Sequence, residues 1–281
     1  MSDHSYLTRR RILKTGLVSL AVTAVTANPL QASKKLPGET RVLFLMGDYA
    51  HNGMMLEYHW RGDLGTTDWR LLFAQSSKYV TPEILADTDL FVLQRNERLN
   101  TPNMLGWAPD RIVEDRPEPA LFMTDEFENA VIENVKRGMG LISMHNSIAN
   151  YRRTKYLDLL GVVERIPHTR QQPAYMHDLN QNHPITRGIE DFSVGIDEIF
   201  NAVLRPGQTE LLFKTRGNDP EIDANGGWTR EVGNGHVVVL LPGHNPSVYI
   251  KKSFKEIMWR SAHWALKKDI PPSDFKDGRD Y

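Results

Sequence analysis

The chain has 281 residues, of which 25% are charged and 40% are hydrophobic, and its formal net charge at pH 7 is −1. This length and composition are typical of a globular protein with one large or two small domains, and they exclude a largely disordered chain. The near-neutral charge provides no broad positive field for nucleic acid. The absence of cysteine excludes disulfides, cysteine-ligated metals, iron–sulfur clusters and thiol nucleophiles.

The N-terminal segment has the layout of an export signal. Arg9, Arg10 and Arg11 precede a weakly apolar run over residues 16–27, and residues 30–32 offer a small-residue cleavage site. The paired arginines before Ile-Leu-Lys are similar to a twin-arginine signal. The apolar run is shorter than the ~20 residues that a stable membrane span needs. We therefore expect residues 1–32 to be a cleaved twin-arginine signal peptide that directs a periplasmic or secreted protein. An uncleaved anchor or an amphipathic arm is the alternative.

Strand-like and helix-like patterns alternate along the first half of the remaining chain. Short apolar runs, typical of buried strands, cover residues 41–46, 69–74, 89–93 and 141–144. Apolar residues three and four positions apart predict a helix after Thr124, whose hydroxyl can cap it. A second helical pattern covers residues 151–160 and ends at a glycine.

The second half of the chain is richer in strands. Further strands are predicted over residues 174–179, 200–204, 210–214 and 235–241, and a closing helix over residues 253–266. Gly226-Gly227 is typical of a turn. Strands that alternate with helices predict an α/β fold with a doubly wound sheet.

Two segments fall outside this regular pattern. Residues 96–119 contain four prolines, and a connection of that length is usually a lid or a binding loop. Trp107 in this loop can stack on a sugar face or pack against the base of its own loop. Residues 268–281 carry Pro271-Pro272 and many charges, which predicts a loose C-terminal tail.

Polar residues follow three of the predicted strands. Asp48 and His51 follow the first strand, His145 and Asn146 follow residues 141–144, and His244 follows residues 235–241. Ligands bind outside the carboxyl ends of the strands in an open α/β sheet, so the three imidazoles converge if these strands are neighbours. Each histidine could instead cap a backbone group.

These residues have two chemical interpretations. His145 and His244 are candidate catalytic groups, because imidazole moves protons at neutral pH, and Asn146 is a candidate substrate-binding residue. His51, His145, His244 and Asp48 are also candidate ligands of a divalent metal, for which zinc, manganese and iron are suitable.

Two further groups remain open between a functional and a structural role. Asp197 and Glu198 are either the acidic, catalytic side of a pocket or a turn with surface charge. Trp228 and Arg230 suit a sugar or carboxylate ligand, whereas a tryptophan in the core is the alternative. Ser147 provides a hydroxyl shortly after His145, which leaves a serine hydrolase as a weaker hypothesis. We find no dinucleotide fingerprint, P-loop or GxSxG elbow, so we expect no nucleotide cofactor.

Several blocks of sequence, in order, resemble the ThuA-like family, which is named for trehalose utilization. They are residues 138–146, residues 183–189 followed by Asp197-Glu198, residues 228–244 and the helix over 259–266, and the similarity extends over residues 39–267. The resemblance implies a flavodoxin-like, mostly parallel sheet with helices on both faces, within the class I glutamine amidotransferase-like superfamily. That superfamily has a cysteine near the position of His145, so the cysteine-free chain does not fit thiol-based amidotransferase chemistry.

The resemblance also implies a role in disaccharide or keto-sugar metabolism beside a separate NAD-dependent dehydrogenase. The leading hypothesis is an exported enzyme that acts on a glycoside or an oxidised sugar by histidine-based proton transfer, isomerisation or cleavage, with or without the assistance of a metal. The alternative is a non-catalytic sugar-binding or accessory protein that supports the dehydrogenase. Neither the substrate nor the oligomeric state follows from the sequence.

Overall fold

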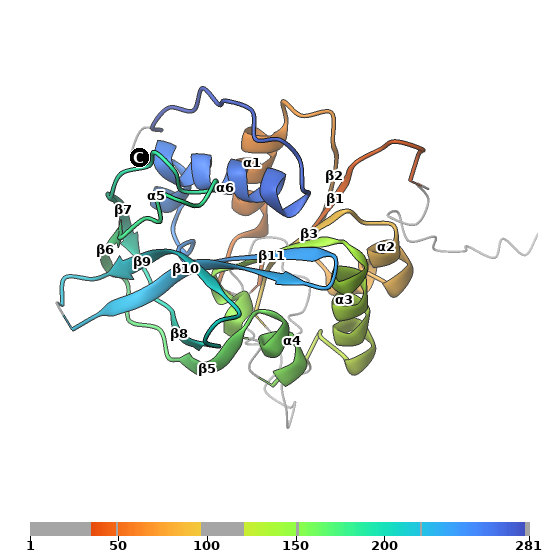
Figure 1. The fold of residues 1–281 in the computed structure, drawn as a ribbon, viewed down its shortest axis with the longest axis horizontal. Helices are drawn as coiled ribbons and strands as arrows, with labels where there is room; N and C mark the ends of the chain where they lie inside the picture. Colours follow the sequence, from red (N-terminus) through yellow and green to blue (C-terminus); the bar gives the residue numbers. More distant parts are fainter. Residues whose placement is uncertain (1–34, 49, 97–120, 150–151, 220, 279–281) are drawn as a thin grey trace, which may run out of the picture.

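The fold is built on one large mixed sheet. The computed structural model describes residues 35–48, 50–96, 121–149, 152–219 and 221–278 (Figure 1). The strands of the parallel half are β1 (Arg41–Met46), β2 (Arg70–Ala74), β3 (Leu90–Gln94), β4 (Gly140–Met144) and β11 (Gly235–Leu240). The strands of the antiparallel half are β6 (Gln172–His177), β7 (Phe192–Asp197), β9 (Glu210–Arg216) and β10 (Asp223–Val232). Their order is β2-β1-β3-β4-β11-β10-β9-β6-β7.

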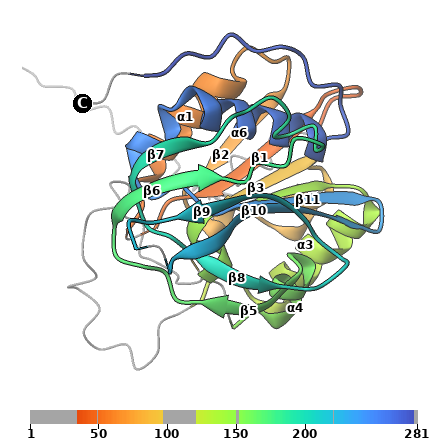
Figure 2. The same cartoon turned by 60° about the vertical axis from the view of Figure 1, so that its left-hand side comes forward.

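Helices cover both faces of this sheet. The first face carries α1 (Gly53–Leu64), α5 (Pro246–Tyr249) and α6 (Lys252–Ala265), and the second carries α2 (Pro82–Ala86), α3 (Asp125–Arg137) and α4 (Thr154–Leu159) (Figures 1 and 2). Short 3₁₀ turns, η1 (Ser77–Tyr79) and η2 (His145–Ala149), follow β2 and β4. A small antiparallel pair, β5 (Val162–Ile166) and β8 (Asn201–Leu204), lies beside the main sheet.

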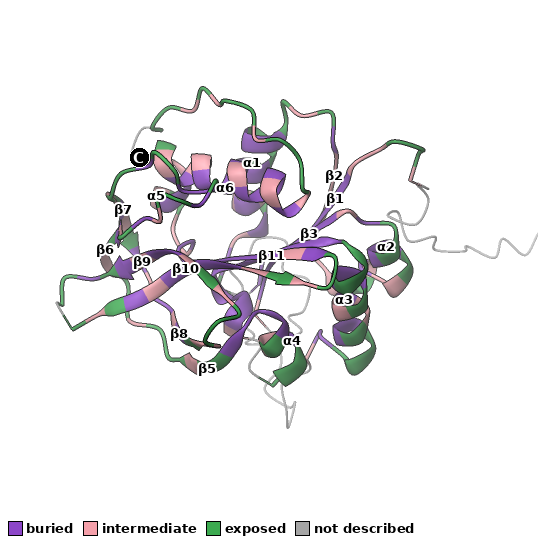
Figure 3. Cartoon of the chain, in the orientation of Figure 1, coloured by how far each residue is buried: buried purple, intermediate pink, exposed green. Residues whose placement is uncertain are grey.

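The apolar composition of the parallel strands follows from this layering. In β1, Phe44 packs in the core under α1 and α6, whereas Leu43 and Leu45 pack in the core on the opposite face. Strand side chains alternate between the two faces, so a strand covered on both sides must be apolar throughout. Figure 3 shows the buried residues concentrated in this central layer.

The predicted flavodoxin-like α/β fold is confirmed. The four strands expected in the first half of the chain are present, and α3 begins after Thr124, whose Oγ1 accepts a hydrogen bond from the Phe127 N–H at 3.2 Å. Beyond β11 the sheet continues as four antiparallel strands, an extension that the local sequence patterns do not indicate.

The prediction of a turn at Gly226-Gly227 is wrong. Both glycines lie inside β10, and a side chain at either position would collide with the Phe213 ring of β9. An added Cβ would lie 2.7 Å from that ring at Gly226 and 2.5 Å at Gly227. Glycine is needed here for the close approach of two strands, and a sequence pattern alone does not separate that role from turn formation.

The C-terminal segment differs from the expected loose tail. Residues 268–278 run back along α6: the Trp259 indole donates to the Pro271 carbonyl at 3.2 Å. Asp277 accepts the Lys252 N–H at 2.7 Å, so it caps the first turn of α6. The expected signal segment (residues 1–32) and Trp107 with nearly all of its loop lie outside the described residues. Within the described residues, no helix has both the length and the apolar character needed to cross a membrane.

Helix α1 was not predicted because its buried face is partly polar. His59 and Asp63 are buried between α1 and α6, while Met54 and Tyr58 point to solvent. Asp63 Oδ2 has no hydrogen-bond partner among the described residues. Burial raises the pKa of Asp63 to about 7, and the nearby Lys255 ammonium opposes this shift only in part.

This buried carboxyl should make the protein less stable as the pH rises. Because the folded pKa lies above the unfolded one, the free energy of unfolding should fall between about pH 4 and pH 7. We expect Asp63→Asn to raise the free energy of unfolding at pH 8 by about 1–3 kcal/mol, with the gain disappearing near pH 4. Urea unfolding across this range is the measurement, with the exposed Asp68→Asn as control. A gain that does not depend on pH would contradict the assignment.

Candidate functional site

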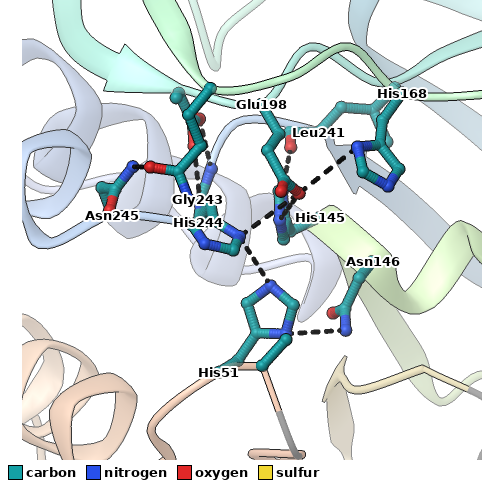
Figure 4. Close-up of polar contacts among 12 residues, drawn as sticks. His51, His145, Asn146, His168, Glu198, Leu241, Gly243, His244 and Asn245 are labelled. Carbon is teal, nitrogen blue, oxygen red and sulfur yellow. Dashed lines mark hydrogen bonds and ion pairs between the residues drawn. The ribbon is translucent and has the colours of Figure 1, made fainter.

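Four side chains from distant parts of the sequence converge beyond the carboxyl ends of the parallel strands. His51 follows β1, His145 follows β4, His244 follows β11, and Glu198 reaches the same place from the end of β7. One ligand-type atom of each residue lies within 4.8 Å of the corresponding atoms of the other three (Figure 4). The strands β1, β3, β4 and β11 are parallel neighbours, so the loops after them share one edge of the sheet.

His145 occupies the strand-to-helix elbow and is fully buried. Its φ of 47° is in the left-handed region, which is unusual for a residue other than glycine and frequent at functional sites. Nδ1 lies 2.8 Å from the Leu241 carbonyl oxygen and therefore donates its proton there. The other ring nitrogen, Nε2, is a buried acceptor without a hydrogen-bond partner among the described residues, 3.7 Å from Glu198 Oε2. Burial lowers the pKa of His145, and the nearby Glu198 carboxylate opposes this shift only in part, so the ring is neutral.

Asp48 lies behind His51 and orients it. The His51 Nδ1 proton is donated to Asp48 Oδ1 at 2.8 Å, which directs His51 Nε2 toward the cluster. Burial by itself raises the pKa of Asp48, but the charge and hydrogen bond of His51 outweigh it and hold that pKa below its usual range. Asn146 Nδ2 also donates to Asp48. Asp48 and Asn146 therefore support His51, in the way that carboxylates support histidine ligands of metals.

Glu198 and His244 form the more exposed side of the cluster. His244 Nδ1 lies 3.3 Å from Glu198 Oε2 and 3.1 Å from His51 Nε2. Burial alone would raise the pKa of Glu198 and lower that of His244. The neighbouring imidazoles outweigh burial at Glu198, and the neighbouring carboxylates outweigh it at His244, so Glu198 is held ionised and the pKa of His244 is raised.

The peptide that carries His244 is held from both sides. Asp197 accepts the Gly243 N–H and the His244 N–H, each at 2.9 Å. On the other side, the Gly243 carbonyl accepts hydrogen bonds from Tyr249 Oη at 2.8 Å and from Gln94 Nε2 at 3.1 Å. Gly243 has a φ of 149°, and an added Cβ would lie 2.7 Å from Tyr249 Oη. Asp197, a predicted catalytic acid, is thus engaged with this backbone turn, whereas Glu198 faces the cluster.

The predicted substrate-binding residues Trp228 and Arg230 do not reach the cluster. Trp228 is fully buried and donates its indole proton to the Leu160 carbonyl at 2.8 Å. Arg230 pairs with Val237 near the start of β11, whereas the cluster lies beyond its end. The Arg230 guanidinium donates to Gln208 Oε1 at 2.7 Å. These positions correct the sequence-based interpretation. Trp228 is a core residue, and Arg230 lies beside the start of β11, far along the strand from the cluster.

The hydroxyl of Ser147 belongs to a buried chain that leads away from the cluster. Its Oγ lies 2.5 Å from Ser143 Oγ, which in turn lies 2.9 Å from the Tyr156 hydroxyl. All three residues are fully buried, and burial raises the pKa of Tyr156 to about 12. The contact of Ser147 with Ser143 is with another hydroxyl, which is not a base, so this arrangement does not support the serine hydrolase hypothesis.

Sequence reasoning missed several residues that shape the site. Gln94 is the last residue of β3 and Arg95 directly follows it, so the same strand-end argument could have identified them. Tyr249 lies five residues beyond His244. His168 and Phe200 come from the antiparallel half, and nothing in their local sequence indicates that they approach His145.

The donor set fits a divalent metal ion. Ligand atoms that surround a tetrahedral ion at about 2.0–2.1 Å are about 3.4 Å apart. The contacts of 3.1, 3.3 and 3.7 Å within the cluster are close to that spacing. Imidazoles with a carboxylate are common ligands of zinc, manganese and iron. The unpartnered Nε2 of His145 is the strongest sign, because a buried acceptor without a partner is costly.

The geometry predicts that Asp197 stabilises the turn before His244. In Asp197→Asn, an amide NH₂ replaces one acceptor oxygen, so one buried backbone N–H loses its partner. We expect the free energy of unfolding to fall by about 1–3 kcal/mol. Denaturant unfolding measures this, with the exposed Asp191→Asn as control. Equal losses in the two variants would contradict the role assigned to Asp197.

Comparison with known proteins agrees with this architecture. A family model for trehalose utilisation, ThuA, matches residues 74–265. A ThuA-like protein from Bacteroides uniformis has a TM-score of 0.62 at 14% identity, with 84% of this chain and 96% of that chain covered. A ThuA-like protein from Parabacteroides merdae has a TM-score of 0.62 at 16% identity, with 84% and 94% covered. A comparison with curated protein sequences gave no match. The chain belongs to the ThuA family, which has the glutamine amidotransferase-like fold.

Proposed function

We propose that this protein is a metal-dependent enzyme of carbohydrate metabolism that acts on an oxidised sugar by proton transfer. The family description points to a carbohydrate-related role. The observation that carries the metal-dependent part is the buried Nε2 of His145, which makes no hydrogen bond within the described part of the chain and lies near three other ligand-type side chains. A cluster with a donor atom left free is suited to bind an ion.

His51, His145 and His244 would hold the ion, and zinc, manganese and iron are the candidates. Three protein ligands with an open position are typical of catalytic metal sites. The hydrogen bonds from His51 to Asp48 and from His145 to Leu241 present a lone pair on each Nε2. When bound, the ion would polarise a carbonyl or hydroxyl oxygen of the substrate.

Glu198 would accept the proton. Its side chain is 16% exposed, while those of His51 and His145 are 4% and 0% exposed, so it borders the side that a ligand can reach. The pKa of Glu198 is held below its usual range, so the carboxylate is ionised and can accept a proton. The sugar carbonyl would come from a separate oxidation, since the sequence of this chain contains no dinucleotide fingerprint.

This proposal predicts that the purified protein contains a metal ion and that retention of the ion requires His145. Purified protein should contain about one divalent ion per chain, and His145→Ala should remove most of it, because the change deletes a buried ligand. The control His177→Ala alters a histidine outside the cluster. Elemental analysis measures metal content, and deuterium incorporation next to the carbonyl of an oxidised disaccharide in D₂O measures proton transfer.

The outcomes separate enzyme from accessory protein. The proposal would be contradicted if the wild-type protein contains no stoichiometric metal and the His145→Ala variant turns over the sugar at an unchanged rate. Sugar binding that is insensitive to chelators and is never followed by deuterium incorporation would favour the accessory, non-catalytic role instead.

We also propose that the protein is exported by the twin-arginine route. The basis is the arginine cluster before a weakly apolar segment. Replacement of Arg9 and Arg10 by lysine should abolish accumulation of the mature protein outside the cytoplasm, as measured by fractionation and mass determination of the N-terminus. Unchanged periplasmic yield would show that the twin-arginine assignment is incorrect.

A further inference from the structure

His168 lies beside the cluster, although it is distant in sequence from the three histidines of the cluster. The backbone that carries it is tied to the segment after Glu198: Thr169 N donates to the Ile199 carbonyl at 3.1 Å, and Ile199 N donates to Thr169 Oγ1 at 3.1 Å. These two bonds keep the His168 loop next to Glu198, as Figure 4 shows.

The imidazole of His168 is held by its ring face and by one nitrogen. The ring stacks on Phe200 at 4.7 Å and 29°, and Phe200 in turn contacts the His145 ring edge-on at 4.7 Å. His168 Nδ1 lies 2.8 Å from the Thr169 carbonyl oxygen, to which it donates, and 3.6 Å from Glu198 Oε2. Nε2 makes no hydrogen bond to any described residue, and the side chain is 44% exposed.

Neither a packing role nor a metal-ligand role explains the position of the His168 ring. A packing role would bury the ring, yet almost half of the side chain remains accessible. A role as a metal ligand would need a free nitrogen that faces the cluster, whereas the nitrogen nearer Glu198 is already engaged with Thr169. The arrangement instead presents a fixed acceptor, Nε2, to solvent beside the site. Preorganisation of this kind lowers the entropic cost of binding a ligand.

A second polar side chain borders the site on the opposite side of Glu198 and His244 (Figure 4). Asn245 Nδ2 donates to Gln171 Oε1 at 3.1 Å and to the Ile196 carbonyl at 3.0 Å. Both donors of its amide are therefore used, and its oxygen stays available as an acceptor. His168 Nε2 and the Asn245 amide oxygen are therefore two acceptors held near the cluster, and acceptors of this kind suit a ligand with several hydroxyl groups.

We propose that His168 is a substrate-contacting residue whose Nε2 accepts a hydrogen bond from a sugar hydroxyl while the oxidised carbon of the sugar faces the cluster. This inference rests on the proposed function and deepens it by naming a residue that selects polyhydroxylated substrates. Loss of a single hydrogen bond of this type should weaken binding by about tenfold.

A pair of substitutions can separate the two ring nitrogens. His168→Asn keeps a polar atom near the position of Nδ1 and removes Nε2, while His168→Gln places an amide atom near Nε2. The probes are trehalose and trehalose with one ring hydroxyl oxidised to a ketone, titrated calorimetrically into metal-loaded protein. His177→Asn is the control, because His177 lies outside the site and pairs with Asp223.

We expect His168→Asn to weaken binding of the oxidised sugar about tenfold, and His168→Gln to retain it within about threefold. Metal affinity should change less than twofold in both variants. Unchanged sugar binding in His168→Asn, or a loss of metal that accounts for the weaker binding, would overturn the inference. Wild type that holds its metal but binds neither probe would overturn it too, whereas wild type that holds no metal would overturn the proposed function itself.

Discussion

The hydrogen bond from His145 Nδ1 to the Leu241 carbonyl determines what the rest of the site can do. It uses the one ring proton of a neutral histidine and leaves Nε2 as an acceptor in a place that solvent does not reach. A buried acceptor without a partner costs about 1–3 kcal/mol, so the fold carries a local penalty there. Such penalties are frequent at functional sites. A bound cation would remove the penalty at His145 Nε2, and His51, Glu198 and His244 place further ligand-type atoms around the same point.

Each of the other two imidazoles depends on its own buried carboxylate. Asp48 accepts the Nδ1 proton of His51, and Asp197 holds the backbone on which His244 is mounted. Asp48 orients the imidazole ring of His51, whereas Asp197 holds the backbone turn that carries His244. Both carboxylates are buried, and the free-energy cost of burying a charge must be offset by hydrogen bonds. Asp48 accepts further hydrogen bonds from backbone N–H groups, and Asp197 accepts those of Gly243 and His244. The site is therefore supported by a rigid polar shell from both halves of the sheet.

The parts of the fold that could be predicted are those with a local physical signature. Strands β1, β4 and β11 are apolar on both faces because helices cover both, and the rule about their carboxyl ends placed His51, His145 and His244 at one edge. Helix α1 lacked such a signature, because His59 and Asp63 occupy its buried face. The glycines of β10 serve a contact with Phe213, which lies ten or more residues away in the sequence.

The errors in the site arise from strand direction and from burial. The strands β10 and β11 are antiparallel, so Arg230 pairs near the start of β11, whereas His244 follows its end, and Trp228 is buried in the core. Conversely, His168 is far from His145 in sequence and reaches it through Phe200. Distances in the antiparallel half depend on strand order and register, and no motif in this sequence encodes either.

The central claim, that three histidines hold a metal ion, is tested most directly by X-ray absorption at the metal edge of the loaded protein. We predict first-shell nitrogen at about 2.0–2.1 Å if the ion is zinc, with the outer-shell scattering pattern of about three imidazoles. Loss of roughly one imidazole in His145→Gln would assign that residue as a ligand. A first shell of oxygen alone, without imidazole scattering, would contradict the account.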